Sequence, residues 1–382
     1  MSKALRIIHV ITGLDTGGAE MMLYRLLTAL DQEEFSSQII SVTGDGPMGD
    51  KIRALDVPVM ALGMKSVAGG PAATLRLARW LRQNPPDVMQ TWMYHADLVG
   101  SLAVRLVGGI PLVWGLHNSV LDANTSKRTT HLTVKMLSRL SHFAPDRILS
   151  CSQTASDLHI GLGYDAGRMV QIPNGFDLTN FYADSSARLS VRQELDIAPE
   201  TLLIGAVGRF DPQKDYPNLI SAAGWLHAAR PEVHFLLCGE GLTAENETLM
   251  GWIYARGLQK RFHLLGRRDD VPRLMNSFDL LTTSSAYGEA FPLVVGEAMA
   301  CEVPCVVTDL GDSAFLVGDT GKVVPPKEPA ALAAAWNAVL SLPAGQRAAL
   351  GAAARQRIEE NFSLSSVAAK YAALYRELAA GE

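Results

Sequence analysis

The chain has 382 residues, of which 48% are hydrophobic and 19% are charged, and its formal net charge at pH 7 is −5. This composition excludes a disordered chain, and the acidic balance argues against a nucleic-acid binder that works through overall charge. The length exceeds that of one ordinary core, so two domains are expected. No segment approaches the roughly 20 apolar residues of a membrane span.

The four cysteines and the N-terminal residues indicate the cellular compartment in which the protein is expected. Cys301 and Cys305 are four positions apart, but no second pair or nearby histidine completes a zinc set, so we expect buried free thiols and no metal. The apolar run Leu5–Ile11 is short and ends near Gly13, which indicates a first strand rather than a signal peptide. A cytoplasmic protein is expected.

The first half alternates short apolar runs with helical patterns. After the run Leu5–Ile11 and a helical stretch at 19–30, strands are expected near residues 37–43, 56–62, 87–92, 111–117 and 147–152. The stretch 72–83 is amphipathic and predicts a helix with three arginines among its apolar residues. Such runs separated by helices indicate βα units and a parallel sheet.

The second half repeats the arrangement. Strands are expected near residues 201–210, 233–240, 261–266, 279–284 and 304–309, with a helix at 215–229 and a long alanine-rich helix from Pro329. A turn-rich segment from Asn174 to Ser190 breaks both periodicities and marks the domain junction. The fold class is therefore α/β, with two doubly wound domains whose ligand is expected at the carboxyl ends of the strands, in a cleft.

Two loops are candidates for phosphate binding. "ITGLDTGGAE" follows the first strand, and Gly17 and Gly18 permit close backbone approach to an anion at a helix N-terminus. A tight βα turn explains this loop equally well, and its glycines are not in the dinucleotide-binding register. "VGRFDPQKD" places Arg209 at the end of a strand and Lys214 before the next helix. Two cations at one strand-to-helix turn favour the binding of a diphosphate, and a pair of ordinary surface cations is the alternative.

Two glutamates bracket a short apolar run further along the chain. Glu289 is expected at the rim of the sheet, and Pro292 suits the first turn of a helix that contains Glu297. A carboxylate within a largely apolar helix needs partners, and a pair of ligand hydroxyls would serve. A salt-bridged surface glutamate is the alternative.

Together these segments resemble the retaining glycosyltransferases of the GT-B fold, family 4 in particular. Glu289 to Glu297 matches that family's E-x7-E motif, and "GAVGRFDPQKD", "GLDTGGAE", "IPNGFD" and "VVTDLGDSAFLVGDTGKVVPP" resemble its other segments. The resemblance covers nearly the whole chain. It implies two Rossmann-like domains facing across a cleft: residues 1–177 on the acceptor side, residues 178–362 for the nucleotide sugar, and a C-terminal helix, 363–382, that packs back on the first.

The resemblance also implies roles for individual residues. Arg209 and Lys214 hold the donor diphosphate without a metal, Glu297 binds the ribose hydroxyls, and Glu289 contacts the transferred sugar. The N–H groups around Phe291, Pro292 and Leu293 add donors, although Pro292 itself has none. Gly17 and Gly18 approach the phosphates, and His117 contacts the sugar from the N-terminal domain.

Three segments depart from the family pattern. The family often has E-G-F-G where this chain has E-A-F-P from Glu289 to Pro292, and it often has glycine where this chain has Asp215. The later segment "TDLGDSA" contains one glycine, Gly311, so a ligand-loop glycine is replaced. These departures concern the shape of the sugar pocket.

The implied reaction transfers a hexosyl or N-acetylhexosaminyl group, from a UDP-sugar by preference, to a glycan or polyprenyl-linked acceptor, in bacterial cell-surface polysaccharide synthesis. Residues 126–143 predict a helix with Leu132, Met136, Leu140 and Phe143 on one face and basic residues elsewhere. Such a helix could rest on the inner face of an anionic membrane, or pack as an ordinary amphipathic helix on the sheet.

Three rival functions remain at this point. An NDP-sugar epimerase of the same fold would release the nucleotide without an acceptor. A non-catalytic protein would bind the nucleotide sugar without turnover. A dinucleotide-dependent oxidoreductase is disfavoured because the Rossmann fingerprint is missing.

Overall fold

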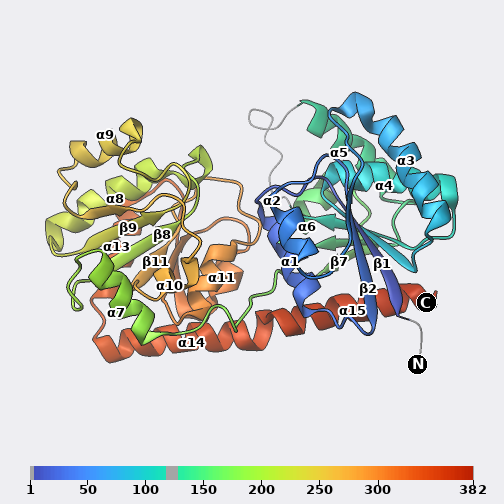
Figure 1. The fold of residues 1–382 in the computed structure, drawn as a ribbon. Helices are drawn as coiled ribbons and strands as arrows, with labels where there is room; N and C mark the ends of the chain where they lie inside the picture. Colours follow the sequence, from blue (N-terminus) through green and yellow to red (C-terminus); the bar gives the residue numbers. More distant parts are fainter. Residues whose placement is uncertain (1–3, 118–127, 382) are drawn as a thin grey trace. The chain divides into compact units, whose positions relative to one another are not determined.

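The computed structural model describes residues 4–117 and 128–381, which form two compact units (Figure 1). Unit 1 comprises the chain segments 1–175 and 364–382, and unit 2 comprises 176–363. The chain passes between the units twice, after Gly175 and after Ser363. Phe176 forms a parallel bridge with Ser363, and its N–H donates to the carbonyl of Phe362 at 2.9 Å, so the two connections run together.

The described part of unit 1 contains a seven-stranded parallel sheet. Its order is β3-β2-β1-β4-β5-β6-β7, which reverses direction between β1 and β4, as in a doubly wound fold. The strands are β1 (Leu5–Ile11), β2 (Phe35–Ser41), β3 (Val59–Ala61), β4 (Val88–Trp92), β5 (Leu112–Leu116), β6 (Arg147–Ser150) and β7 (Met169–Gln171). The register of the first pair runs from Leu5↔Phe35 to Ile11↔Ser41.

Successive residues of these strands face opposite sides of the sheet, so each side has its own apolar core. Ile7 and Ile11 of β1 contribute to one core, and Ile8 and Val10 to the other. The first core lies under α1 (Gly18–Ala29), α2 (Pro47–Arg53) and α15 (Leu364–Ala380). The second lies under α3 (Gly70–Gln83), α4 (Tyr94–Val107) and α5 (Arg128–Leu140). Helix α6 (Gln153–Gly161) follows β6.

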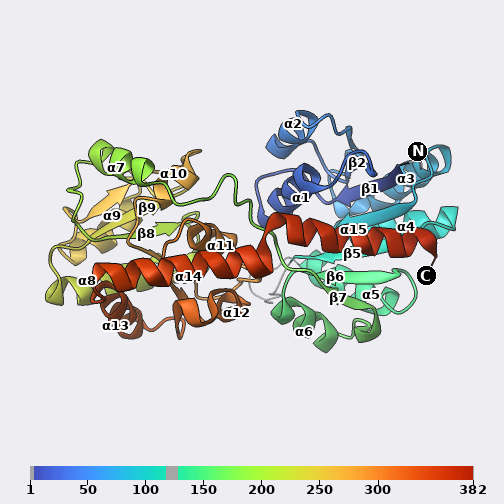
Figure 2. The ribbon, with the colours of Figure 1, turned by 90° about the horizontal axis from the view of Figure 1, so that it is seen from below.

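The C-terminal helix α15 lies across one face of the unit 1 sheet (Figure 2). Val367, Tyr371, Leu374 and Leu378 recur at helical spacing and are all buried, as the sequence predicts. The Tyr375 hydroxyl donates to Gln90 Oε1 of β4, which fixes the helix to the sheet by a buried polar contact. The last helix is therefore an integral part of the N-terminal unit's core.

The described part of unit 2 contains a six-stranded parallel sheet in the order β10-β9-β8-β11-β12-β13. Its strands are β8 (Leu203–Val207), β9 (His234–Cys238), β10 (Phe262–Leu264), β11 (Leu280–Thr282), β12 (Cys305–Thr308) and β13 (Gly321–Val324). Its helices are α7 (Ser185–Glu194), α8 (Tyr216–Ala229), α9 (Glu247–Ala255), α10 (Val271–Met275), α11 (Leu293–Ala300), α12 (Ser313–Val317), α13 (Pro329–Leu340) and α14 (Ala344–Phe362). The predicted fold class, two doubly wound α/β sheets, is confirmed.

Several local expectations needed correction. The strands β7 and β13 lie outside the runs expected from sequence, because each is a short edge strand with little buried apolar surface. The long alanine-rich helix begins at Pro329 as expected but ends at Leu340, and α14 begins after Pro343. Proline lacks the N–H that a helix interior needs, which accounts for the break. Ser126 and Lys127, the start of the expected amphipathic helix, lie outside the described residues.

None of the helices within residues 4–117 and 128–381 combines the length and apolar character that crossing a membrane requires.

Candidate functional site

The loop after β8 carries both predicted cations. Arg209 follows the strand by two residues and is exposed, and Lys214 ends a short 3-10 helix, Pro212–Lys214. The loop is held by its neighbour after β9: the Phe210 N–H donates to the carbonyl of Glu240 at 2.7 Å. A Cβ at Gly239, whose φ is +148°, would lie 2.0 Å from the carbonyl oxygen of Gly208, so only glycine permits this contact.

Asp215 adopts the left-handed backbone conformation at a position where the family often has glycine. Its φ and ψ are 48° and 54°, the left-handed region, which Asp tolerates better than most residues. Its side chain also accepts from the Asn218 N–H and caps helix α8. The turn between Lys214 and α8 thus keeps the conformation a glycine would give and gains a cap.

Glu289 and Lys214 are in direct contact. Lys214 Nζ lies 2.5 Å from Glu289 Oε1, and the same oxygen accepts from the Ser285 hydroxyl at 2.6 Å. The Glu289 and Lys214 side chains are only 10% and 24% exposed, so the ion pair is partly shielded from water. The Ser284 hydroxyl donates to the Lys214 carbonyl at 2.7 Å, which joins the loop after β11 to the loop after β8.

The segment between the two glutamates forms the N-terminus of α11. Pro292 is the residue before the helix, with extended ψ of 104°, and no side chain caps this end. Phe291 is buried, with its ring 6.1 Å from that of Phe176 and 5.6 Å from that of Phe362. Leu293 begins the helix, and Glu297 is half-buried one turn further on. An uncapped N-terminus offers N–H donors and a positive dipole end to an anion.

Gly311 has a packing role in the same region. Its φ is +57°, and a Cβ there would lie 2.2 Å from the carbonyl oxygen of Glu289. The Asp312 N–H donates to the carbonyl of Ala290 at 2.8 Å. The single glycine of "TDLGDSA" therefore lets the loop after β12 lie against the backbone of Glu289 and Ala290.

In unit 1, His117 follows β5 and its ring stacks on Trp92. The ring centroids are 5.0 Å apart, at an angle of 12°. Burial lowers the pKa of His117 to about 4, so the imidazole is neutral at pH 7. Its Nε2 atom is buried and has no hydrogen-bond partner among the described residues. Its predicted contact with the sugar stays a prediction.

Gly17 and Gly18 lie at the start of α1, where Glu20 is the nearest charged group. A Cβ at Gly17 would lie 2.4 Å from Glu20 Oε2, whereas a Cβ at Gly18 would meet no atom within 4 Å. Burial raises the pKa of Glu20, whose carboxylate accepts from its own backbone N–H. The Glu20 carboxylate therefore lies close to Gly17 at the start of α1. The two glycines' predicted role stays a prediction.

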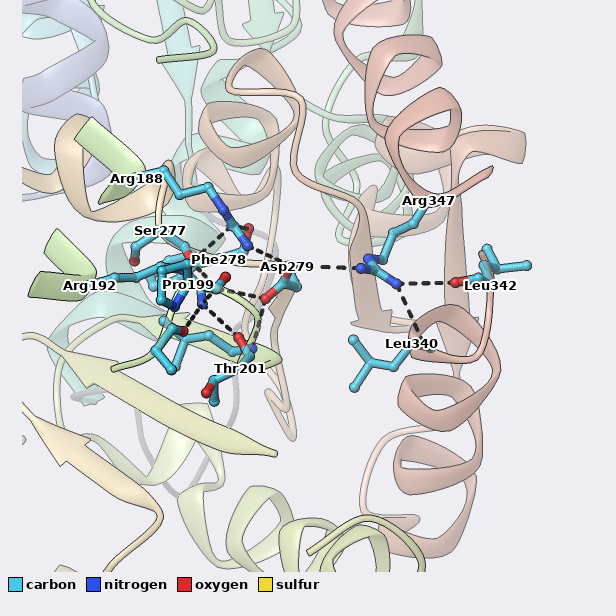
Figure 3. Close-up of polar contacts among 12 residues, drawn as sticks. Arg188, Arg192, Pro199, Thr201, Ser277, Phe278, Asp279, Leu340, Leu342 and Arg347 are labelled. Atoms are coloured by element: carbon cyan, nitrogen blue, oxygen red, sulfur yellow. Dashed lines mark hydrogen bonds and ion pairs between the residues drawn. The ribbon is translucent and has the colours of Figure 1, made fainter. Parts of the chain in front are cut away.

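Three arginines of unit 2 surround Asp279. Arg188 and Arg192 donate to Asp279 at 2.8 and 2.7 Å, and Arg347 Nη2 lies 3.9 Å from the same carboxylate (Figure 3). Asp279 precedes β11 and also accepts from the Leu203 N–H at the start of β8. The cluster therefore sits at the amino ends of the strands, opposite to Lys214, and we interpret it as structural.

The structure thus brings Lys214 and Glu289 together, places Arg209 on the same loop as Lys214, and places Glu297 on the helix that follows Glu289. The sequence did not indicate Ser285, Trp92 or Glu20. Ser285 is four residues from Glu289 within a loop, where no periodicity predicts which side chains meet. The stretch "SSAYGE" shows only that hydroxyl groups lie near a carboxylate.

Two doubly wound units, with a cation and carboxylates at the carboxyl ends of the strands in the second, define the GT-B class of glycosyltransferases. A model described as Glycosyltransferase Family 4 matches residues 16–180, and one described as Glycosyl transferases group 1 matches residues 188–357. The chain belongs to glycosyltransferase family 4 and is a glycosyltransferase.

Two relatives and one solved structure illustrate the similarity. The phosphatidyl-myo-inositol mannosyltransferase of Mycolicibacterium smegmatis is 30% identical over 71% of this chain and 66% of its own length. The Escherichia coli UDP-Gal:alpha-D-GlcNAc-diphosphoundecaprenol alpha-1,3-galactosyltransferase is 24% identical over 82% and 81%. Anabaena HepE, solved in complex with UDP, has a TM-score of 0.86 and 23% identity, with 98% of this chain and all of that chain covered.

Proposed function

We propose that this glycosyltransferase moves a sugar from a nucleotide diphosphate sugar, a UDP-sugar by preference, to a hydroxyl of a lipid-linked or glycan acceptor. The observation that carries the proposal is the contact of Lys214 with Glu289 beside the uncapped N-terminus of α11. The relatives' names support the donor and acceptor classes, since one contains UDP-Gal and diphosphoundecaprenol and another contains phosphatidyl-myo-inositol. A UDP complex of a similar fold supports UDP.

The proposed chemistry depends on charge at the leaving group. The bond between the anomeric carbon and the diphosphate oxygen breaks, the acceptor oxygen bonds to that carbon from the same face, and the acceptor's proton passes to the departing phosphate. Configuration is then retained. Negative charge grows on the diphosphate as the bond breaks, and Arg209 and Lys214 stabilise it because they are already in place.

Glu289 and Glu297 have complementary proposed roles. Glu297, in the second turn of α11, accepts from the ribose hydroxyls, and Glu289 contacts the transferred sugar. Phe291, Pro292 and Leu293 shape the start of the helix, an end that no side chain caps and whose positive dipole end favours an anion. The reaction needs no metal in this proposal, because side-chain cations supply the positive charge. Turnover that is unchanged by a chelator is the expected result.

Donor turnover with a panel of UDP-, GDP- and ADP-sugars tests the proposal. Transfer to a polyprenyl-diphosphate or glycan acceptor, with the anomeric configuration of the donor, is expected for one UDP-sugar. Release of a rearranged sugar without acceptor would identify an epimerase instead. Tight binding of the sugar nucleotide with no product from any acceptor would identify a non-catalytic binding protein. Product with inverted configuration would contradict the retaining mechanism.

We propose that the reaction belongs to cell-surface polysaccharide or glycolipid synthesis, at the inner face of a membrane. The support is the lipid-linked substrates that the relatives' names contain. A lipid-linked acceptor keeps its reactive hydroxyl near the bilayer surface, so an enzyme that rests on this surface meets it at a higher local concentration.

A further inference from the structure

The outer layer of unit 1 has an unusual distribution of charge. Helices α3, α4 and α5 cover one face of the sheet, and α4 packs against both of the others (Figure 1). Their sequences contain one acidic residue, Asp97, which is fully buried and accepts from the Thr91 hydroxyl at 2.6 Å. Among the side chains that the structure describes, the outward faces carry six basic ones: Arg76, Arg79, Arg82, Arg105, Lys135 and Arg139. This layer is therefore strongly positive in a chain whose net charge is −5.

These basic groups keep their charge within the part of the chain that the structure describes. None of the six forms an ion pair with a carboxylate of the described residues. Arg82 donates to the carbonyl of Leu106 at 2.8 Å, and Arg76 donates to the carbonyl of Leu62, contacts that leave the full positive charge. Several arginines of unit 2 behave differently: Arg188 and Arg192 share Asp279 (Figure 3), and Arg268 and Arg273 pair with Glu194 and Asp270.

Large apolar side chains project between the basic ones. Leu75 on α3 is 63% exposed, Leu132 on α5 is 61% exposed, and Phe143, just after α5, is 66% exposed. Leu102, Leu106 and Met136 are exposed as well. The inward residues of the same helices, such as Leu77, Val99 and Leu137, are buried in the core, so the exposed set is additional to what folding requires. The sequence left two alternatives for α5, a helix on a membrane or a helix packed on the sheet. The helix packs on the sheet and still presents apolar side chains to solvent.

We infer that this basic and apolar face of α3, α4 and α5 rests on the surface of an anionic lipid bilayer. Anionic headgroups attract unpaired arginines, while leucine and phenylalanine side chains insert among the acyl chains. A second copy of the chain is a poorer occupant, because two-fold symmetry would bring the same positive face against itself. A nucleic acid would match the charge but would leave six large apolar groups unburied. The inference rests on the proposed lipid-linked acceptor and locates the surface that approaches it.

The test uses vesicle sedimentation with the full chain. Vesicles of phosphatidylcholine are compared with vesicles that contain about one third phosphatidylglycerol, at low and high salt. Binding to the anionic vesicles alone, weakened by salt, is expected. The charge variant combines Arg79→Gln, Arg105→Gln and Arg139→Gln, one per helix, because these side chains form no hydrogen bond with another described residue. About fivefold weaker binding per removed charge gives a loss of about 100-fold.

Two matched controls separate this face from general surface effects. Lys260→Gln, Lys322→Gln and Lys327→Gln remove the same charge from exposed positions of unit 2. A second variant removes apolar groups from the face by the changes Leu75→Ser, Leu102→Ser and Leu132→Ser. Its control removes exposed apolar groups from unit 2 by the changes Leu189→Ser, Trp225→Ser and Tyr254→Ser. The face variants are expected to lose vesicle binding, whereas both unit 2 controls keep it.

Several outcomes would overturn the inference. They are no binding of the wild-type chain to anionic vesicles at low salt, equal losses in the unit 2 controls, or self-association that the Leu75, Leu102 and Leu132 changes abolish. UDP binding by calorimetry is measured on the same variants and is expected to be unchanged. A chain that binds vesicles but no sugar nucleotide would contradict the proposed function alone, so the two failures are distinguishable.

Discussion

Lys214 Nζ lies 2.5 Å from Glu289 Oε1, so the cation proposed to hold the donor diphosphate is paired with a carboxylate in the donor-free chain. The diphosphate and Glu289 therefore compete for one ammonium group. The Ser285 hydroxyl donates a hydrogen bond to the same oxygen of Glu289. Donor binding must loosen the ion pair, or add the phosphate to it, before the sugar is transferred.

Glu289→Gln removes the competing charge. We expect UDP to bind about fivefold more tightly, since a partly exposed ion pair is worth about 1 kcal/mol, while turnover of the UDP-sugar falls because the sugar contact is altered. Calorimetry with UDP and steady-state kinetics measure the two effects. Weaker UDP binding in Glu289→Gln would show that the carboxylate positions Lys214 instead of competing for it.

Ser285→Ala removes a hydrogen bond to Glu289. A net hydrogen bond to a charged group contributes about 1.5–3 kcal/mol, so kcat is expected to fall by about tenfold or more with little change in KM for the donor. Ser285→Thr keeps the hydroxyl and should restore most of the rate. If Ser285→Ala only lowered the free energy of unfolding and left kcat intact, its proposed positioning of Glu289 would be wrong.

Asp215 combines a left-handed backbone with a helix cap, and three substitutions separate these contributions. Asp215→Asn keeps both and should be nearly neutral. Asp215→Gly keeps the backbone conformation and loses the cap, whereas Asp215→Ala loses both and should lower the free energy of unfolding by about 1–2 kcal/mol. Urea unfolding ranks the three. Equal stability of the alanine and asparagine variants would contradict this explanation.

His9 predicts how stability depends on pH. The side chain is fully buried, accepts from Trp92 Nε1 at 3.3 Å, and has its pKa lowered by burial from 6.5 to about 3. The unfolded chain binds a proton at His9 below pH 6.5 that the folded chain does not bind until about pH 3. The stability due to the neutral ring is therefore present above pH 6.5 and declines as the pH falls, by about 3 kcal/mol at pH 4.

Urea unfolding of the wild-type chain and of His9→Gln between pH 7.5 and 4 measures this dependence. The variant should be less stable at pH 7.5, because it loses the ring, but its free energy of unfolding should decline less steeply by about one proton. Parallel pH profiles for the two proteins would show that His9 is not the titrating group.

The sequence predicted the central strands, the fold class and the positions of Arg209, Lys214 and Glu297, because buried parallel strands have strong apolar runs and the functional loops follow them directly. It did not predict β7 and β13, since edge strands such as Met169–Gln171 bury too little apolar surface to leave a pattern. Leu75 shows a different limit. Its apolar side chain alone suggests burial, but Leu75 is two residues from the buried Leu77, a spacing that puts it on the other side of the helix, where it is 63% exposed.

The sequence could not predict the contacts between loops, because these contacts depend on how distant segments pack against each other. The meeting of Lys214 with Glu289 depends on how two loops, 75 positions apart, lie against each other through the Ser284 hydroxyl and the carbonyl of Lys214. No periodicity governs such contacts. Gly311 likewise has a role that is visible only from its positive φ and from the carbonyl of Glu289 beside it.

The central claim is that fixed positive charge from Arg209 and Lys214 stabilises the departing diphosphate, and steady-state turnover of the UDP-sugar by Arg209→Ala and Lys214→Ala tests it most directly. Lys260→Ala, an exposed cation of the same unit, is the control. Each site variant should lower kcat by about 10²–10³, the scale for one preorganised donor, while the control keeps wild-type turnover. A fall of less than about threefold in both site variants would contradict the account.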